Sequence, residues 1–326
     1  MREKAENISE FLLGLYAHAA EASPDEFRRQ TLRRLGGLIA FDFALWGGGR
    51  ADDRRVSDLT ALGQTPRVLE DWSAVADTDA FCDIALNRLG QTARFDDIEN
   101  YRRTPAYNEH WKRFGARQMM ATIAAEPQDG YVSFVGLCAD TETALFSDTA
   151  RRLKHTLMPH LSAALRINRR TTLYRHADRD EAVGLIDRDG WVLASHGAFA
   201  ELLRGECDRP DRLPSALRAA MPIGLPWQGR TIAATAEKLG EHFLLRVRRL
   251  GPLARLSARE REVARHYVYG LTYREIAGTL GIAPSTVRNH IFNLYAKLEI
   301  ASKIELAQLH RQETVAASRA GAPQPG

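Results

Sequence analysis

The C-terminal sixth of the chain has the clearest helical periodicity. Val287, Ile291, Leu294 and Leu298 recur at i, i+4, i+7 and i+11, so they share one face of a helix. Three capping boxes, each a Ser or Thr followed three residues later by Glu, mark further helix starts. These pairs are Ser257 with Glu260, Thr272 with Glu275, and Ser302 with Glu305. Together the patterns predict helices at 257–269, 272–280, 284–298 and 302–312.

The opposite face of the helix at 284–298 is polar and basic. Arg and Asn can contact base edges in the major groove through two hydrogen bonds each, whereas Lys and Thr commonly contact phosphates. The connection at 280–283 is as short as a helix-turn-helix requires. The candidate DNA-contacting residues are Ser285, Thr286, Arg288, Asn289, Phe292, Asn293 and Lys297.

This segment resembles the LuxR/FixJ-type helix-turn-helix in the order and spacing of Glu260-Arg261-Glu262-Val263, Glu275-Ile276-Ala277, Thr286-Val287-Arg288 and Lys297-Leu298. The resemblance implies that the helix at 284–298 enters the major groove. Arg288, Asn289 and Phe292 then lie where bases are read, and Thr286 and Lys297 where phosphates are held. It also implies a homodimer on a two-fold symmetric operator in double-stranded DNA, with RNA polymerase as a further expected partner.

Three positions depart from that family pattern. Ala283 stands where a hydroxyl usually caps the recognition helix, a loss of about 1 kcal/mol that Pro284 partly offsets. Glu299 replaces the common glycine after Lys297-Leu298, so this turn is expected to differ. Phe292 is an aromatic at a position that is often polar, and it either contacts a thymine methyl or turns back onto Tyr295 or the linker.

Residues 1–175 have the pattern of an antiparallel sheet flanked by helices. Phe41, Phe43 and Leu45 alternate with Ala44 and Trp46, the period of a strand, and the run ends in three glycines. The pattern predicts helices at 5–21 and 24–38, and strands at 41–46, 56–63, 117–126 and 131–138. The last strand is apolar on both faces, so cover is expected on both sides of the sheet.

The order of these elements resembles GAF-like sensor domains, whose fold is related to the acyl-homoserine-lactone-binding domains of quorum sensors. The resemblance implies a site for a small-molecule effector. The expected lining residues are Trp46, Tyr101, Tyr107, Trp111, Met120 and Phe134, with plain core packing as the alternative for each. The Trp-Tyr-Asp-Pro-Trp constellation of lactone receptors is not found in order, because Asp77 is followed by Thr78.

Residues 176–250 predict a smaller α+β unit. The elements expected here are a hairpin at 183–193, a helix at 197–204 and a second hairpin at 227–249. Their order resembles a short PAS domain. We expect this unit to act as a structural bridge rather than to bind a cofactor. The expected domains are therefore 1–175 (GAF-like sensor), 176–250 (PAS-like unit and linker), 251–313 (all-α four-helix reader) and 314–326 (disordered tail).

Composition narrows the class of protein. The 326 residues are 44% hydrophobic and 26% charged, and the net charge of +4 excludes a general polyanion binder. Cys82, Cys138 and Cys207 are odd in number and widely spaced, which predicts a reducing compartment. There is no signal peptide or long apolar run, so a cytoplasmic protein without membrane contact is expected.

Other classes find little support in the sequence. Gly47-Gly48-Gly49-Arg50 lacks the Lys and Ser/Thr of a phosphate loop, and no nucleophile elbow or zinc spacing occurs. The acidic pair Asp52-Asp53 lacks the further Asp and Lys of a phosphate receiver. We therefore expect a regulator rather than an enzyme, with no metal or cofactor. Control by a protein partner, without any small ligand, remains the alternative mode of regulation.

Overall fold

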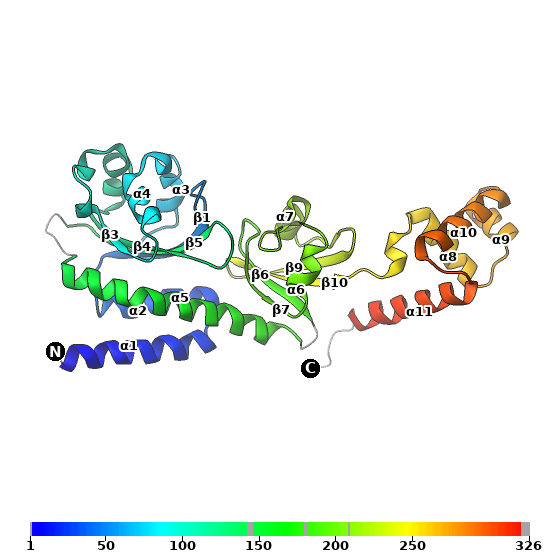
Figure 1. Ribbon diagram of the computed structural model, residues 1–326, viewed down its shortest axis with the longest axis horizontal. Coiled ribbons are helices and arrows are strands. Elements are labelled where there is room, and N and C mark those ends of the chain that lie inside the picture. The colour runs from blue at the N-terminus through cyan, green and yellow to red at the C-terminus, as the bar shows by residue number, and fades with distance from the viewer. Residues whose placement is uncertain (1, 142–145, 179–180, 208, 321–326) are drawn as a thin grey trace. The chain divides into compact units, whose positions relative to one another are not determined.

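A five-stranded antiparallel sheet organises the N-terminal part of the chain, with strand order β2-β1-β5-β4-β3 (Figure 1). All four strands predicted for this part of the chain are confirmed to within a few residues, and the short strand β3 was not predicted. The strands are β1 (Phe43–Arg50), β2 (Val56–Leu62), β3 (Thr92–Arg94), β4 (Gln118–Ala125) and β5 (Tyr131–Ala139).

The computed structural model describes residues 2–141, 146–178, 181–207 and 209–320. It divides into two units, of which the first comprises residues 1–227 and 234–247 and the second residues 228–233 and 248–326. Across the described residues, none of the helices is both long and apolar enough to cross a membrane.

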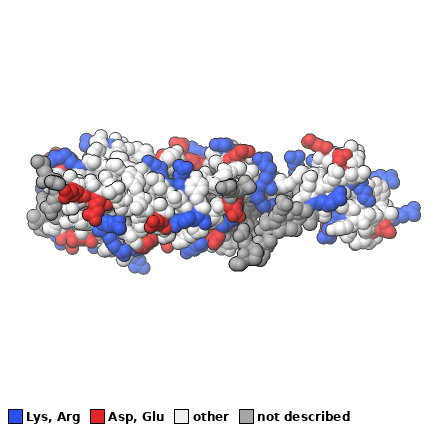
Figure 2. Space-filling view, turned by 90° about the horizontal axis from the view of Figure 1, so that it is seen from below, with Lys and Arg blue, Asp and Glu red and all other residues white. Residues whose placement is uncertain are grey.

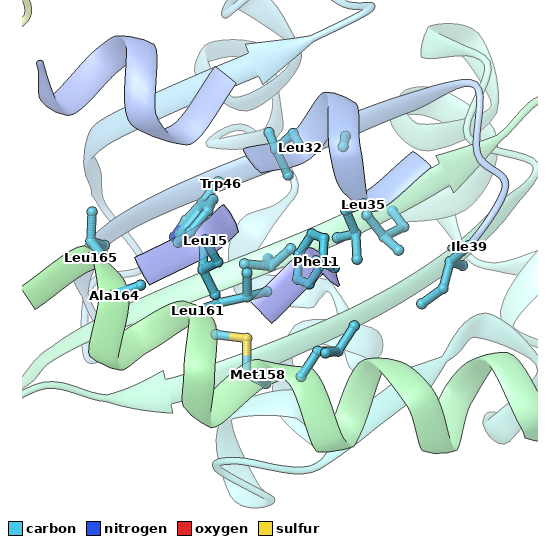
Figure 3. Packing of buried hydrophobic residues seen from close by; sticks show 14 of the residues in the cluster. Phe11, Leu15, Leu32, Leu35, Ile39, Trp46, Met158, Leu161, Ala164 and Leu165 are labelled. Carbon is cyan, nitrogen blue, oxygen red and sulfur yellow. The ribbon is translucent and has the colours of Figure 1, made fainter. Parts of the chain in front are cut away.

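Three long helices cover one face of the sheet (Figure 1). They are α1 (Arg2–Glu21), α2 (Pro24–Gly36) and α5 (Asp148–His176). Figure 3 shows Phe11, Leu15, Leu161 and Leu165 from α1 and α5 gathered around Trp46 of β1. Burial of these apolar side chains, each worth about 1.5–3 kcal/mol, fixes the helices on the sheet.

The other face is covered by short helices and irregular chain. Here α3 (Arg67–Trp72), α4 (Ala80–Asn87) and the turns of residues 95–114 pack over the sheet. Phe43 and Leu45 point to this face, whereas Ala44 and Trp46 point to the long helices. The predicted alternation of β1 and the two-sided burial of the sheet are therefore confirmed.

The three glycines of β1 lie inside the strand, not beyond its end as the sequence suggested. A Cβ on Gly47 would come within 2.6 Å of both the Asp58 carbonyl oxygen and the Phe134 ring, and one on Gly48 within 2.7 Å of the Tyr131 hydroxyl. Only a residue without a side chain lets these neighbours lie across the strand. The glycines thus permit close cross-strand packing.

A second sheet follows in the chain, with strand order β7-β6-β10-β9-β8. The hairpins and the helix expected between 183 and 249 are present. The elements are β6 (Ala182–Ile186), β7 (Val192–His196), α6 (Phe199–Arg204), α7 (Ser215–Ala220), β8 (Trp227–Gln228), β9 (Ile232–Leu239) and β10 (His242–Arg249). Most of this sheet belongs to the same unit as the first, so the chain does not separate near residue 175.

A buried charge cluster joins the two sheets. The Asp58 carboxylate of β2 lies 2.6 Å from Arg28 Nη2, 3.1 Å from Arg169 Nη2 and 3.2 Å from His242 Nε2. All four side chains are buried. Burial alone would raise the pKa of Asp58, but Arg28, His242 and Arg169 hold the pKa well below its ordinary value.

Ser57 adds a second polar link between the sheets. Its hydroxyl donates to Oδ2 of Asp187 at 2.5 Å, and the other oxygen of Asp187 accepts the backbone N–H of Trp191 at 2.8 Å. Burial raises the pKa of Asp187 to about 6. Consecutive residues of β2 are therefore bonded to β10 and to the turn after β6.

The second unit contains four helices joined by short turns. They are α8 (Ala258–Val268), α9 (Tyr273–Leu280), α10 (Pro284–Leu298) and α11 (Lys303–Ala320). Two of the three predicted capping boxes form, at Ser257 and at Thr272; for example, Ser257 N–H donates to Glu260 Oε2 at 2.8 Å. At the third, the Glu305 N–H donates to Ser302 Oγ, but the Glu305 carboxylate accepts the N–H of Ala301 instead of that of Ser302. The helix α11 runs through 314–320, which the sequence placed in a disordered tail, and 321–326 lie outside the described residues.

Lys154 of α5 is the least expected side chain in the first unit's interior. It is fully buried, and its ammonium donates to Thr122 Oγ1 at 2.6 Å. Among the described residues, none forms an ion pair with Lys154. Burial lowers the pKa of Lys154 to about 7, because no carboxylate compensates for its lost hydration.

Replacement of Lys154 by Met is expected to stabilise the protein. The unfolded side chain has a pKa of about 10.4, so between about pH 7 and 10 the unfolded state binds more protons than the folded state. The burial penalty is therefore full below pH 7 and fades as the pH rises. Lys154→Met should raise the free energy of unfolding at pH 7 by roughly 2 kcal/mol and less at pH 9.5.

Urea unfolding at the two pH values measures this effect. Lys112→Met, at an exposed position, is the matched control and should change neither value by more than about 0.5 kcal/mol. A Lys154→Met protein that is destabilised at both pH values would show that the ammonium is required by the fold.

Candidate functional site

The exposed face of α10 is the first candidate site. Ser285, Arg288, Asn289 and Asn293 are exposed, and Thr286 is half-buried at the edge of the same face. The opposite face is buried: Val287, Ile291, Leu294 and Leu298 form the core of the second unit, as their spacing predicted. The helix thus presents two Asn and one Arg to solvent at the spacing of one helical face.

Phe292 lies on this exposed face and is 74% accessible. Tyr295, onto which the sequence allowed it to turn, packs instead with the core residues of α8 and α9. An accessible aromatic ring beside Arg288 and Asn289 is the arrangement expected of a side chain that contacts a base, and that contact stays a prediction.

Lys297 has a partner within the protein. Its Nζ lies 2.8 Å from Oε2 of Glu260, the same oxygen that accepts the Ser257 N–H at the start of α8. Burial tends to raise the pKa of Glu260, but Lys297 and Ser257 lower it overall. A phosphate contact by Lys297 would therefore compete with an ion pair that ties α10 to α8.

The two ends of α10 show the departures noted in the sequence. Ala283 makes no side-chain cap, and Pro284 occupies the first turn. Glu299 closes the helix with φ 55°, a left-handed conformation. The left-handed conformation costs a residue other than glycine about 1–2 kcal/mol. The turn therefore has the conformation that glycine favours, and Glu299 lowers the stability of the fold by adopting it.

A cavity of about 90 Å³ is the second candidate site. It lies on the face of the first sheet that α3 and α4 cover, away from the three long helices. Its wall is mainly apolar, and arginines of the β1–β2 connection lie at its rim. The lining residues include Leu45, Arg50, Arg54, Arg55, Val56, Leu69, Trp72, Asp79, Phe81, Cys82, Ala85, Trp111, Met119, Ala121 and Phe134.

Asp79 is the polar centre of this face, and the sequence did not reveal it. Its Oδ1 accepts the Tyr101 hydroxyl at 2.8 Å and the Phe81 N–H at 3.0 Å. Its Oδ2 accepts the indole N–H groups of Trp72 and Trp111, both at 2.9 Å. The carboxylate is fully buried and holds together three separate segments of the chain.

The comparisons with known proteins assign the second unit. The segment 254–310 matches the family described as "Bacterial regulatory proteins, luxR family" (GerE). Residues 254–310 form a LuxR-family helix-turn-helix domain. The prediction from residue order and spacing is thereby confirmed for this segment.

Curated relatives match a short part of this chain. The transcriptional regulatory protein UhpA of Escherichia coli (strain K12) is 43% identical over 53 residues, 16% of this chain and 27% of UhpA. An HTH-type transcriptional regulator of Aeromonas salmonicida is 43% identical over 63 residues, 19% of this chain and 32% of that protein. The chain thus spans a third or less of the length of these relatives.

Solved structures have a broader but weaker likeness to this chain. Escherichia coli SdiA is 13% identical, covering 93% of this chain and 96% of SdiA with a TM-score of 0.37. The N-acylhomoserine lactone dependent LuxR family transcription factor CepR2 from Burkholderia cenocepacia is 16% identical, covering 49% of this chain and 93% of CepR2 with a TM-score of 0.37. These values identify no ligand for this chain.

The predicted ligand residues divide among three places. Trp111 and Phe134 line the cavity. Tyr101 and Tyr107 belong to the same apolar cluster, outside the lining. Trp46 and Met120 belong to the opposite face of the sheet, and Figure 3 shows Trp46 among the core residues there. Trp46 packs on Phe27 with ring centroids 5.8 Å apart.

Placing Trp46 and Met120 in one pocket with the others was wrong, because alternate residues of a strand point to opposite faces. Trp46 follows Leu45, and Met120 follows Met119; Leu45 and Met119 are the residues that line the cavity. The Asp77 considered from the sequence is exposed, whereas Asp79 is buried. The signal that could have found Asp79 is its place as N-cap of α4, immediately before an apolar helix.

Two titratable groups in or beside the wall, Cys82 and Tyr101, stay protonated. Burial raises the pKa of the Cys82 thiol to about 12, and burial together with Asp79 raises the pKa of Tyr101. Among the described residues, no group of three or more His, Cys, Asp or Glu could hold a metal ion. The cavity therefore offers neither a thiolate nucleophile nor a metal centre.

Loss of the Asp79 carboxylate is expected to destabilise the first unit. In Asp79→Asn one oxygen becomes an NH₂ group, which faces donors that then lack an acceptor. The free energy of unfolding should fall by about 2–4 kcal/mol. Asp77→Asn, two residues away and exposed, is the matched control and should stay within about 0.5 kcal/mol of wild type.

Urea unfolding monitored by tryptophan emission measures both variants, since two of the indoles bond to Asp79. Equal stability of Asp79→Asn and Asp77→Asn would show that these hydrogen bonds do not hold the face together.

Proposed function

We propose that this protein is a homodimeric transcription regulator that binds a two-fold symmetric DNA operator through α10 and responds to a small molecule in its N-terminal part. The exposed face of α10 carries this proposal. In a LuxR-family domain, an exposed Arg288 and Asn289 on a helix whose other side is fully packed have the chemistry of base readout.

Charge supports the dimer. Residues 251–313 contain nine Lys or Arg against six Asp or Glu, so one domain has a small positive excess. On the face in Figure 2, acidic and basic side chains are interspersed. Affinity for DNA grows with the number of neutralised phosphates, so two domains bound side by side would bind DNA more tightly than one domain with this small excess.

The strand β2 connects the cavity to the second sheet. Val56 lines the cavity, while the next two residues, Ser57 and Asp58, bond to Asp187 and His242. Arg55, also at the cavity rim, pairs with Asp189 at 2.6 Å. A ligand that shifts the start of β2 would therefore bias the sheet that leads into the LuxR-family domain, which is the differential contact that allostery needs.

Nuclease footprinting on DNA selected by the full chain tests the dimer. The expected footprint covers two inverted half-sites whose centres lie about one helical turn apart. Protection of a single asymmetric half-site by one protomer contradicts the dimeric part of the proposal.

Substitution of Arg288 tests the base-reading face. Arg288→Ala should relax the preference at one base pair, with a loss of discrimination of about 1–3 kcal/mol. Binding to a library of single-base operator variants measures it. Arg265→Ala, an exposed arginine of α8, should lower affinity at most uniformly. Unchanged selectivity of Arg288→Ala removes this residue from the base-reading set.

A further inference from the structure

The wall of the cavity is composed of hydrocarbon and aromatic groups. Leu45, Leu69, Phe81, Met119 and Phe134 surround a space of about 90 Å³. An enclosed apolar cavity of about 150 Å³ lined by Leu, Ile and Phe binds benzene, and this space is of the same order and partly open to solvent. Size and lining thus suit a ligand of about one ring or a short alkyl chain.

The carboxylate of Asp79 has no lone pair to offer such a ligand. Two carboxylate oxygens provide about four acceptor positions, and four protein donors already fill them. Trp72 and Trp111, which line the cavity, donate their indole N–H groups to Asp79, so these donors are not available to a ligand. A ligand donor or acceptor placed here would have to break an existing hydrogen bond.

The arginines at the rim are also matched by acids. Arg50 pairs with Asp52, and Arg54 Nη2 lies 2.5 Å from Asp83 Oδ1. Arg55 Nε lies 2.6 Å from Asp189 Oδ2. An anionic ligand would therefore displace a carboxylate rather than meet an uncompensated positive charge, and would gain little from these three side chains.

No further polar anchor is found in the wall. Among the described residues, the buried side-chain atoms without a hydrogen-bond partner all belong to residues outside the cavity lining. The Cys82 thiol is protonated, because burial raises its pKa to about 12. The buried polar side-chain atoms of the described lining therefore already have partners.

We infer that the cavity takes a small uncharged aromatic or aliphatic compound, held by apolar contact and without a hydrogen bond to Asp79. The inference rests on the proposed sensor function and names the chemical class of the signal. Polar amides and carboxylates of the same size are excluded on this view, because each would be desolvated without gaining a partner.

Three probes that share one ring test this class: toluene, benzamide and benzoate. Calorimetric titration of the full chain should give toluene at least tenfold tighter binding than either polar probe. Tighter binding of benzamide or benzoate than of toluene overturns the inference, because it requires an available hydrogen-bonding group or charge in the wall.

A pair of variants ties the binding to this cavity. Ala85→Leu fills space in the lining and should weaken toluene binding at least tenfold. Ala80→Leu, on the same helix but outside the lining, is the matched control and should keep the wild-type affinity. Absence of toluene binding to the wild type, or equal affinities of the two variants, also overturns the inference.

The operator assays separate this result from the proposed function. If a polar probe binds and changes operator affinity, the sensor function stands and only the ligand class fails. If toluene binds the wild type and Ala80→Leu, but no probe changes operator affinity, the ligand class stands and the sensor function fails.

Discussion

The structure of the first unit depends on the buried carboxylate of Asp58. A single charge in that position would cost several kcal/mol, and Arg28, Arg169 and His242 together offset this cost. These partners come from α2, α5 and β10, so one strand residue joins two helices and the second sheet. Removal of Asp58 itself would leave Arg28 and Arg169 buried without this carboxylate, so the joint depends on this one residue more than on any single partner. The two sheets are therefore held as one unit although they are separate in sequence.

The first sheet separates a side covered by long helices from a side covered by short helices and turns. Long helices with continuous apolar faces cover one side, where Trp46, Leu161 and Leu165 belong to one buried apolar cluster. Short helices and turns cover the other, and Asp79 organises them through four hydrogen bonds. Short elements bury less apolar surface per residue, so a polar hub replaces close packing and space remains beside it. The cavity and the hub thus have a common origin.

The strand β2 connects the side covered by short helices to the second sheet. Its first residues line the cavity, and the next ones bond to the second sheet. The bulge in the pairing of β1 with β2, next to Gly49, interrupts the regular register at this point. In a regular strand, consecutive side chains point to opposite faces of one sheet. A bulge changes this alternation, so that neighbouring residues can contact two different parts of the structure. The cavity and the second sheet are therefore linked through a few neighbouring residues of the chain.

The sequence by itself determined the LuxR-family domain, because its signals are local. Capping boxes and a stripe at helical spacing involve residues no more than a few positions apart; the stripe and two of the three boxes were found where expected. The sequence also determined which side of β1 each residue faces. It did not determine which of its aromatic residues share a pocket, nor that Asp58 and Asp79 are centres of polar networks. Those facts depend on partners many residues away, such as Trp111 for Asp79 and His242 for Asp58. Only the tertiary structure brings such partners within hydrogen-bonding distance, since no local pattern encodes contacts of that range.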